Sequence, residues 1–420
     1  MSTPRHSVLA FGAYLKNRIG WWDGERLHGS ALHGDLGSAQ ACTALQASAS
    51  ALVQQCQASG QRLEAVAHDL HPDFHSTECA LQWAERLQLP ALAVQHHHAH
   101  LAGVACTQGL SGPVLGWALD GFGLGSDGQA WGGELLWVHG AQWRRLARLQ
   151  PIALPGGDRA AREPWRLALA YAHAIGHQSA EPEPDAPGIA SVAPARRQAV
   201  QALLARGLHC PPSSSAGRWF DAVAALLGLC LQQDDEAQAP LALQAQALQA
   251  LTDPASAPER VRDDWLLAHG NGPPDATELP VSRLVQQVLQ LAPTQGLAMA
   301  ALHFHWGLAD GLARVLAHWH AALQDSPAQP LPQVCLSGGC FFNPLLRERL
   351  RWQLEKQGLT VHLHEPDGHG DAHLAWGQAW VAQDWLRRTR TAPDFAMARC
   401  GPLSDESWTG RTRPNKKEMH

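Results

Sequence analysis

The chain has 420 residues, of which 45% are hydrophobic, and 32 Lys and Arg stand against 38 Asp and Glu for a formal net charge of −6. This length corresponds to two or three domains or to one bilobed unit. The 38 Gly and 28 Pro remain below the content of low-complexity disordered chains. The acidic balance lacks the positive field that holds long nucleic acids through their phosphates, so we expect no nucleic-acid partner.

Cysteine usage and the apolar pattern bear on the cellular compartment. Nine cysteines are spread along the chain without a CxxC pair, which argues against a disulfide framework and a four-thiolate zinc site. The start of the chain lacks the pattern of a secretory signal, and no segment approaches about 18 uninterrupted apolar residues. We therefore expect a cytoplasmic protein with no membrane partner.

The first lobe is expected over residues 1–110. Three short strands are predicted within 7–33, with Asp23-Gly24 as a hairpin turn. An alternation of helix and strand follows them. Its predicted elements are a helix over 38–59, a strand over 64–68, a helix over 76–87, a strand over 92–94 and an Ala-rich helix that contains His100.

The same pattern restarts in a second lobe, expected over 111–390. Its predicted elements are strands over 113–120, 130–138 and 143–149, helices from about 160 to 330, a strand over 333–339, a helix over 343–357, a strand over 359–364 and a final helix over 371–386. Two halves that share a β-β-β-α-β-α plan predict a bilobed, actin-like α/β fold of duplicated RNase H-like units, the ASKHA class, with a helical insertion in the second half.

In such a fold a nucleotide would bind in the cleft between the lobes. Turn-forming residues predict surface loops over 179–194 and 253–280, and the polar stretch 391–420 is expected to be a flexible tail.

The clearest chemical signal is a run of four histidines within QHHHAHLAGVA. His96 and His100 stand at i and i+4, so a helix would place them on one face with Cβ atoms about 5–6 Å apart. That spacing suits chelation of one transition-metal ion. The alternative is a solvated helix start or core histidines satisfied by hydrogen bonds.

Two aspartates are the expected oxygen ligands of this metal. Asp120 ends an apolar strand, and Asp371 precedes an apolar helix in GHGDAHLAWGQ. Imidazoles with carboxylates suit a divalent transition metal, with iron and zinc favoured and manganese also compatible. Each aspartate could instead cap a helix or form an Asx turn.

Three glycine-rich turns are candidates for holding phosphates. Turns after the strands ending near 120 and 337 would present amide N–H groups to an anion, and the second leads into a helix. A third turn carries an aspartate that could accept hydrogen bonds from ribose hydroxyls, although each could be a plain turn. The candidate residues are Gly121, Gly123, Gly156, Gly157, Asp158, Gly338, Gly339 and Asn343.

Six segments of the chain together resemble HypF, the carbamoyltransferase family of [NiFe]-hydrogenase maturation. They are VAHDLHPD (66–73), VQHHHAHLA (94–102), LDGFGLGSDGQAWGGELL (119–136), LPGGDRAAREPWR (154–166), SSAGRWFDAVAALLG (214–228) and LSGGCFFNPLL (336–346). The resemblance covers residues 7–385 and concerns the C-terminal, TsaD-like part of a full-length HypF.

This resemblance implies an actin-like fold and transfer of a carbamoyl group from carbamoyl-adenylate to the C-terminal cysteine of HypE. That group later becomes a cyanide ligand of iron. By motif position, His96 and His100 would bind a metal, and Asp120 and Asp371 would complete its shell. The nucleotide, ATP or carbamoyl-adenylate with Mg²⁺, would be contacted by the residues of the SGGxxxN-like run and of the LPGGD turn, which are Gly338, Gly339, Asn343, Gly156, Gly157 and Asp158.

The sequence departs from the family pattern in three places. Gly370-Asp371-Ala372-His373 replaces N-D-G-G, and Glu236-Ala237-Gln238-Ala239 replaces E-G-Q-A. The chain also lacks the acylphosphatase, CxxC zinc-finger and YrdC-like modules that convert carbamoyl phosphate into carbamoyl-adenylate. Either a separate activating protein supplies the adenylate, or the donor differs, or the chain is one fragment of a longer protein.

Two other functions compete with transfer to HypE. One is a small-molecule O-carbamoyltransferase on the same scaffold. The other is a non-catalytic nucleotide- or metal-binding scaffold in hydrogenase assembly, which the missing modules and the altered Asp371 segment would favour. A TsaD-like tRNA modification is disfavoured by the acidic balance and by the HypF-like segments.

Overall fold

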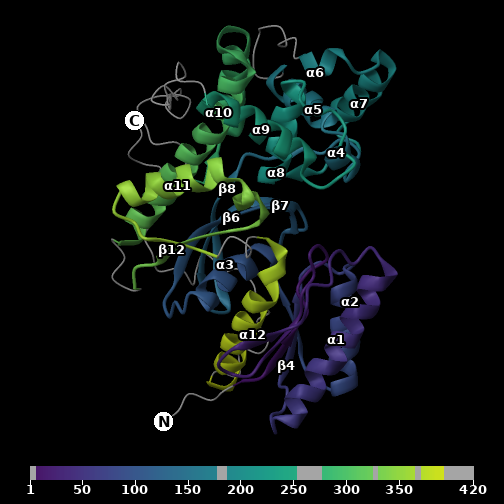
Figure 1. Ribbon diagram of the computed structural model, residues 1–420, viewed down its shortest axis with the longest axis vertical. Helices are drawn as coiled ribbons and strands as arrows, with labels where there is room; N and C mark the ends of the chain where they lie inside the picture. The colour runs from purple at the N-terminus through teal and green to yellow at the C-terminus, as the bar shows by residue number, and fades with distance from the viewer. Residues whose placement is uncertain (1–5, 177–186, 253–276, 325–329, 365–369, 392–420) are drawn as a thin grey trace.

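The structure is a computed structural model that describes residues 6–176, 187–252, 277–324, 330–364 and 370–391. Two mixed β-sheets form two lobes, and a mass of helices covers the far side of the second sheet (Figure 1). The bilobed, actin-like α/β fold expected from the repeated pattern is confirmed. Within the described residues, none of the helices is long and apolar enough to cross a membrane.

The first sheet has the order β3-β2-β1-β4-β5. The antiparallel hairpins β1–β2 and β2–β3 form one side, and β1, β4 and β5 are parallel. Helices α1 and α2 cover the outer face, where α1 begins because the hydroxyl of Ser38 accepts the amide N–H of Ala41 at 3.1 Å. The elements are β1 (Val8–Ala10), β2 (Gly20–Trp22), β3 (Leu27–Gly29), α1 (Ala39–Ala58), β4 (Ala65–Asp69), α2 (His75–Leu87) and β5 (Ala91–Val94).

The second sheet has the order β11-β8-β7-β6-β12-β13, with β9 and β10 paired beside β7. Its central strand β6 is buried from Val114 to Leu119 because helices cover both faces of the sheet. The strands are β6 (Val114–Leu124), β7 (Ala130–His139), β8 (Gln142–Leu149), β9 (Ile152–Ala153), β10 (Pro212–Ser213), β11 (Glu278–Leu279), β12 (Gln333–Ser337) and β13 (Val361–Leu363).

The helical insertion packs on the outer face of this second sheet as one apolar core. The longest helix of this insertion that the structure describes, α10 (Val281–Gln324), is interrupted at Gly296, which has a φ of 86° and lies three residues after Pro293. The helices of this face are α4 (Arg159–Arg162), α5 (Trp165–Gly176), α6 (Pro187–Ala190), α7 (Pro194–Arg206), α8 (Ala216–Leu226), α9 (Gln238–Thr252), α10 (Val281–Gln324), η3 (Gly339–Phe342) and α11 (Pro344–Lys356).

Two of the expected surface loops contain regular structure in part. Residues 187–190 form α6, and residues 278–279 form β11, which pairs with β8. The prediction of loops is wrong at those positions, because packing against neighbouring elements overrides the turn-forming composition. Residues 179–186 and 253–276 of these two stretches, and residues 392–420 of the expected tail, lie outside the described residues.

Helices α3 (His96–Thr107) and α12 (Leu374–Thr391) lie between the two sheets (Figure 1). Helix α3 packs on β6, β7 and β12, and α12 packs on α3 and on β1 and β4. Their approach requires glycine, because a Cβ atom on Gly377 would lie 1.8 Å from the carbonyl oxygen of Ala99. The segment expected as one final helix over 371–386 begins with a 3₁₀ turn, η5 (Asp371–His373). Helix α12, which follows it, packs against β1, β2 and β4 of the first sheet.

Asp384 of α12 connects this helix to the hairpin between β7 and β8. Its carboxylate accepts the amide N–H of Ala141 at 2.9 Å and pairs with Arg387 and Arg388. Burial alone would raise the pKa of Asp384, but the Ala141 amide and the two arginines hold it below the ordinary value of 3.8. The carboxylate thus stabilises the fold above the unfolded pKa, and this contribution is lost as the pH falls through the folded pKa.

Replacing Asp384 by asparagine is expected to lower the free energy of unfolding by about 1–3 kcal/mol near neutral pH. The loss follows because a neutral amide cannot form the two ion pairs with Arg387 and Arg388. Urea unfolding of both proteins, followed by circular dichroism from neutral pH to below the unfolded pKa of 3.8, measures the difference. The two curves should converge at low pH, and a gap independent of pH would contradict the role of the charge.

Candidate metal centre

Helix α3 begins at the edge of the first sheet and presents two histidines along one face. The chain leaves β5 at Val94, and Gln95 caps the helix with its side-chain oxygen 2.9 Å from the amide nitrogen of His98. One helical turn separates His96 from His100, so both rings project to the same side. Their ring centroids are 4.9 Å apart.

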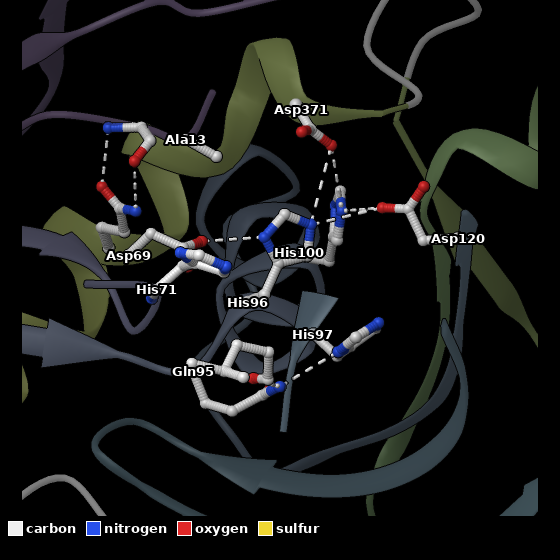
Figure 2. Close-up of polar contacts among 12 residues, drawn as sticks. Ala13, Asp69, His71, Gln95, His96, His97, His100, Asp120 and Asp371 are labelled. Carbon is white, nitrogen blue, oxygen red and sulfur yellow. Dashed lines mark hydrogen bonds and ion pairs between the residues drawn. The ribbon is translucent and has the colours of Figure 1, made fainter. Parts of the chain in front are cut away.

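Two carboxylates meet these rings. Asp120 lies within β6, and Asp371 lies at the start of η5, far along the chain. Nε2 of His100 is 2.9 Å from Oδ2 of Asp120, and Nε2 of His96 is 3.3 Å from the same oxygen. Oδ1 of Asp371 lies 3.7 Å from Nε2 of His96 and 3.6 Å from Nε2 of His100. Figure 2 shows the two carboxylates and both Nε2 atoms directed toward one another.

One ligand atom from each of His96, His100, Asp120 and Asp371 lies within 4.8 Å of the others. The histidine side chains are almost fully buried, whereas those of the aspartates are each 14% exposed. We call these four residues the His–Asp cluster. Two imidazole nitrogens and two carboxylate oxygens around one point are a donor set that could hold a divalent transition-metal ion.

A third aspartate, Asp69, orients His96 from behind the cluster. Its Oδ2 lies 2.8 Å from Nδ1 of His96, and both side chains are buried. Because a carboxylate can only accept, Nδ1 of His96 donates to Asp69, which leaves Nε2 as the ring nitrogen that would bind a metal. The hydroxyl of Ser337 lies 3.4 Å from Nδ1 of His100 and occupies the corresponding position there.

The charges of the cluster support one another. Burial alone would lower the pKa of His96, but Asp69, Asp371 and Asp120 raise it well above 6.5. Burial alone would likewise lower the pKa of His100, but hydrogen bonds with Asp120 and Asp371 raise it above 6.5. The pKa of Asp120 is held well below its ordinary value, against burial, by the two imidazoles.

The other two histidines of the run have structural surroundings. His97 is buried with Nδ1 3.0 Å from the side-chain Nε2 of Gln95, and burial lowers its pKa well below 6.5. Nε2 of His98 lies 2.8 Å from the carbonyl oxygen of Gly140, and burial lowers its pKa to about 4. The alternative of hydrogen-bonded core histidines therefore describes these two residues.

The expected glycine turn after Asp120 is misplaced. Gly121 and Gly123 lie inside β6, whose pairing with β7 shifts register between Leu119 and Gly123, and the reversal comes at residues 125–128. A Cβ atom on Gly123 would lie 2.6 Å from the ring of His97 and 2.9 Å from that of His96. The physical reason for glycine at 123 is therefore the close approach of the histidine helix.

The second glycine turn does lie beside the cluster. Gly338 has a φ of 108°, and a Cβ atom there would lie 2.2 Å from the carbonyl oxygen of Leu119. A Cβ atom on Gly339 would lie 3.1 Å from Oδ1 of Asp120. Asn343 caps α11, with its Oδ1 accepting the amide N–H of Leu346 at 3.2 Å.

The third glycine turn starts α4 in the helical insertion. Gly156 and Gly157 both have positive φ, and the exposed Asp158 precedes the helix without a side-chain capping bond.

Two cysteines near the second turn are unsuited to be nucleophiles, since burial raises the pKa of the thiols of Cys335 and Cys340.

Two family models together span most of the chain. A model described as the HypF Kae1-like domain matches residues 3–107, and one described as the second subdomain of a carbamoyltransferase Kae1-like domain matches residues 116–378. The chain belongs to the HypF carbamoyltransferase family. The resemblance predicted from the six segments is thereby confirmed.

Relatives of different length share this part. A carbamoyltransferase HypF homolog of Cupriavidus necator is 45% identical over 382 residues, which are 89% of this chain and 91% of that protein. HypF2 of the same organism is 40% identical over 90% of this chain but only 46% of its own length. This chain therefore spans nearly all of one relative and about half of the other.

A solved structure agrees with these matches. The crystal structure of full-length HypF in its phosphate- and nucleotide-bound form superposes with a TM-score of 0.76 and 26% identity. The superposition covers 91% of this chain and 47% of that one. This chain and the matching part of that HypF therefore share one fold.

Proposed function

We propose that this chain transfers a carbamoyl group from carbamoyl-adenylate to the C-terminal cysteine thiol of HypE. The observation that carries the proposal is the His–Asp cluster beside the Gly338-Gly339 turn in a chain of the HypF family. The cluster offers a metal site, and the turn offers backbone amides to a phosphate. Both lie at the inner ends of strands of the second sheet, where actin-like folds bind nucleotides.

The donor atoms of the cluster fit a divalent transition metal such as iron, zinc or manganese. When bound, such an ion would polarise the carbamoyl carbonyl or a phosphate oxygen as a Lewis acid. His96, His100, Asp120 and Asp371 would hold it, and Asp69 would orient the ring of His96 by accepting its Nδ1–H, so that Nε2 is the nitrogen directed at the ion. The nucleotide contacts assigned to Gly121, Gly156, Gly157, Asp158 and Asn343 belong to the same proposal.

The transfer itself needs positioning more than side-chain chemistry. The thiol sulfur forms a bond to the carbamoyl carbon, the bond from that carbon to the phosphate oxygen breaks, AMP leaves, and the thiol loses its proton. The buried His96 and His100 would keep water away from one side of a carbamoyl group bound at the cluster. Exclusion of water matters because the mixed anhydride would otherwise hydrolyse.

Intact-mass spectrometry of HypE tests the proposal. HypE is incubated with the metal-loaded chain and either carbamoyl-adenylate or carbamoyl phosphate with ATP and Mg²⁺. We expect HypE to gain one carbamoyl group with the adenylate, and a HypE variant without its C-terminal cysteine to gain none.

Transfer with carbamoyl phosphate as well would mean that the chain activates its own donor. Transfer with the adenylate alone would mean that a separate protein supplies it. A folded, metal-loaded chain that modifies HypE under neither condition would contradict the proposal and direct the search to a small-molecule acceptor or to a scaffold role.

A further inference from the structure

A buried carboxylate outside the His–Asp cluster has no part in the proposed transfer. Glu134 lies in β7, the strand next to β6, and is 0% exposed. Burying a charged group in a sheet is costly unless hydrogen bonds and a counter-charge compensate it. Its partners therefore indicate what the residue holds in place.

Glu134 fixes two backbone segments at once. Its Oε1 accepts the amide N–H groups of Gly132 at 3.2 Å and Gly133 at 3.1 Å, and it also accepts the hydroxyl of Ser214. The guanidinium of Arg145 lies 3.4 Å from Oε2 and supplies the counter-charge. The carboxylate thus joins β7 to the segment that precedes α8.

The neighbouring Ser215 carries this connection to the cluster. Its Oγ lies 2.8 Å from the carbonyl oxygens of both Asp120 and Gly121, and it caps α8 by accepting the amide N–H of Arg218 at 3.2 Å. The hydroxyl can donate to one of the two carbonyls at a time. Ser215, the residue after Ser214, is therefore hydrogen-bonded to the backbone of Asp120, a residue of the cluster.

Close packing leaves this backbone little freedom. A Cβ atom on Gly132 would lie 2.5 Å from the carbonyl oxygen of Asp120 and 2.9 Å from Cα of Ser215. A Cβ atom on Gly133 would lie 2.5 Å from the carbonyl oxygen of Ser214. Three segments, 120–121, 132–133 and 214–215, are thus in contact without side chains between them.

The register shift of β6 makes such support necessary. Regular pairing with β7 is interrupted between Leu119 and Gly123, so Asp120 lies in a bulge that the sheet does not hold by ladder bonds. A bulge redirects a side chain, and here it directs that of Asp120 toward the histidines. Ser215 holds the carbonyls of this bulge in place of the ladder.

We propose that Glu134 is a positioning residue for Asp120, acting through Ser214 and Ser215. The inference rests on the proposed metal site and goes beyond it by assigning a role to a carboxylate that touches neither metal nor substrate. Outer residues that fix metal ligands commonly change metal affinity by about 10–100-fold when replaced. Glu134 acts one residue further out, so its replacement is expected near the lower end of that range.

The test compares Glu134→Gln with a matched control, Asp310→Asn. Asp310 is also a buried carboxylate with an arginine partner, since it pairs with Arg349 at 2.8 Å and accepts from Gln353, between α10 and α11. Affinity for Co²⁺ and Zn²⁺ is measured by competition with a chelator, and the visible absorption of bound Co²⁺ reports the ligand geometry. Thermal unfolding of the metal-free proteins is recorded in parallel.

We expect Glu134→Gln to weaken metal binding about tenfold and to change the Co²⁺ spectrum. Asp310→Asn should lower stability without either effect. Equal affinity and an unchanged spectrum in a folded Glu134→Gln protein would overturn the proposal and leave Glu134 a purely structural residue.

If Glu134→Gln does not fold, Ser214→Ala decides the question. This variant removes one hydroxyl, and it should weaken Co²⁺ binding in the same direction by a smaller factor. Unchanged binding in Ser214→Ala would overturn the proposal. A wild-type chain that binds neither metal would instead show that the proposed metal site itself is wrong.

Discussion

Replacing both His96 and His100 by alanine is expected to abolish metal binding and carbamoyl transfer together. The variant removes both nitrogen donors of the cluster and leaves Asp120 and Asp371 without their nearest positive partners. A Lewis-acidic metal contributes several kcal/mol to stabilising developing charge. We therefore expect the transfer rate to fall on the order of 10³-fold or more, or about 4 kcal/mol.

Metal content after purification and HypE carbamoylation by mass spectrometry measure the two effects. His305→Ala is a suitable control, because His305 is fully buried in α10 and its Nδ1 lies 2.7 Å from the carbonyl oxygen of Ala301. That variant should retain both metal and transfer. A double variant that still supports hydrogenase maturation would favour a non-catalytic scaffold, whereas complete loss of carbamoylation would exclude it.

Sequence periodicity was sufficient for the parts of the site that depend on local geometry. Histidines at i and i+4 must share a helix face. Asp120 was expected at the end of its strand, whereas it lies within β6 at the register shift. The repetition of one element order in two halves predicted the bilobed fold. Asp371 was a candidate ligand because it precedes an apolar helix, and the family resemblance agreed, but no local pattern relates positions so far apart.

The features that the sequence did not reveal depend on packing between elements. Asp69 was not among the candidates, although β4 pairs with β5 in a parallel register that places Asp69 opposite Val94, two residues before His96. Only a strand-pairing argument of that kind could have found it. Gly123 was expected in a turn because glycine is typical of turns, whereas its small size here admits the histidine helix.

The position of α12 is a further case of packing that sequence order conceals. The helix ends the second half of the chain, and the repeated order of elements assigned it to the second lobe. In the structure it contacts β1, β4 and α3, and Gln378 exchanges hydrogen bonds with both backbone groups of Gly12 at 2.8 and 3.0 Å. Asp371, at the start of this segment, is thus carried to the boundary between the lobes.

Replacing Asp69 by asparagine is expected to weaken metal binding by about 10–100-fold while preserving the fold. In the wild type, both carboxylate oxygens of Asp69 accept hydrogen bonds, one from Nδ1 of His96 and one from the amide N–H of His71 at 2.9 Å. An asparagine keeps only one acceptor. If its oxygen stays with the His71 amide, its NH₂ group faces Nδ1 and favours the tautomer of His96 that is protonated on Nε2, which cannot bind a metal.

The matched control for this variant is Asp23→Asn, which changes another aspartate–histidine pair. Oδ2 of Asp23 lies 2.6 Å from Nε2 of His28, and Asp23 also accepts two backbone N–H groups in the hairpin between β2 and β3. Chelator competition and the Co²⁺ spectrum of both variants separate the two roles. Both substitutions remove the negative charge from an aspartate–histidine pair. A loss of metal affinity confined to Asp69→Asn therefore assigns the effect to the orientation of His96. Equal affinity in the two variants would mean that His96 binds its metal without help from Asp69.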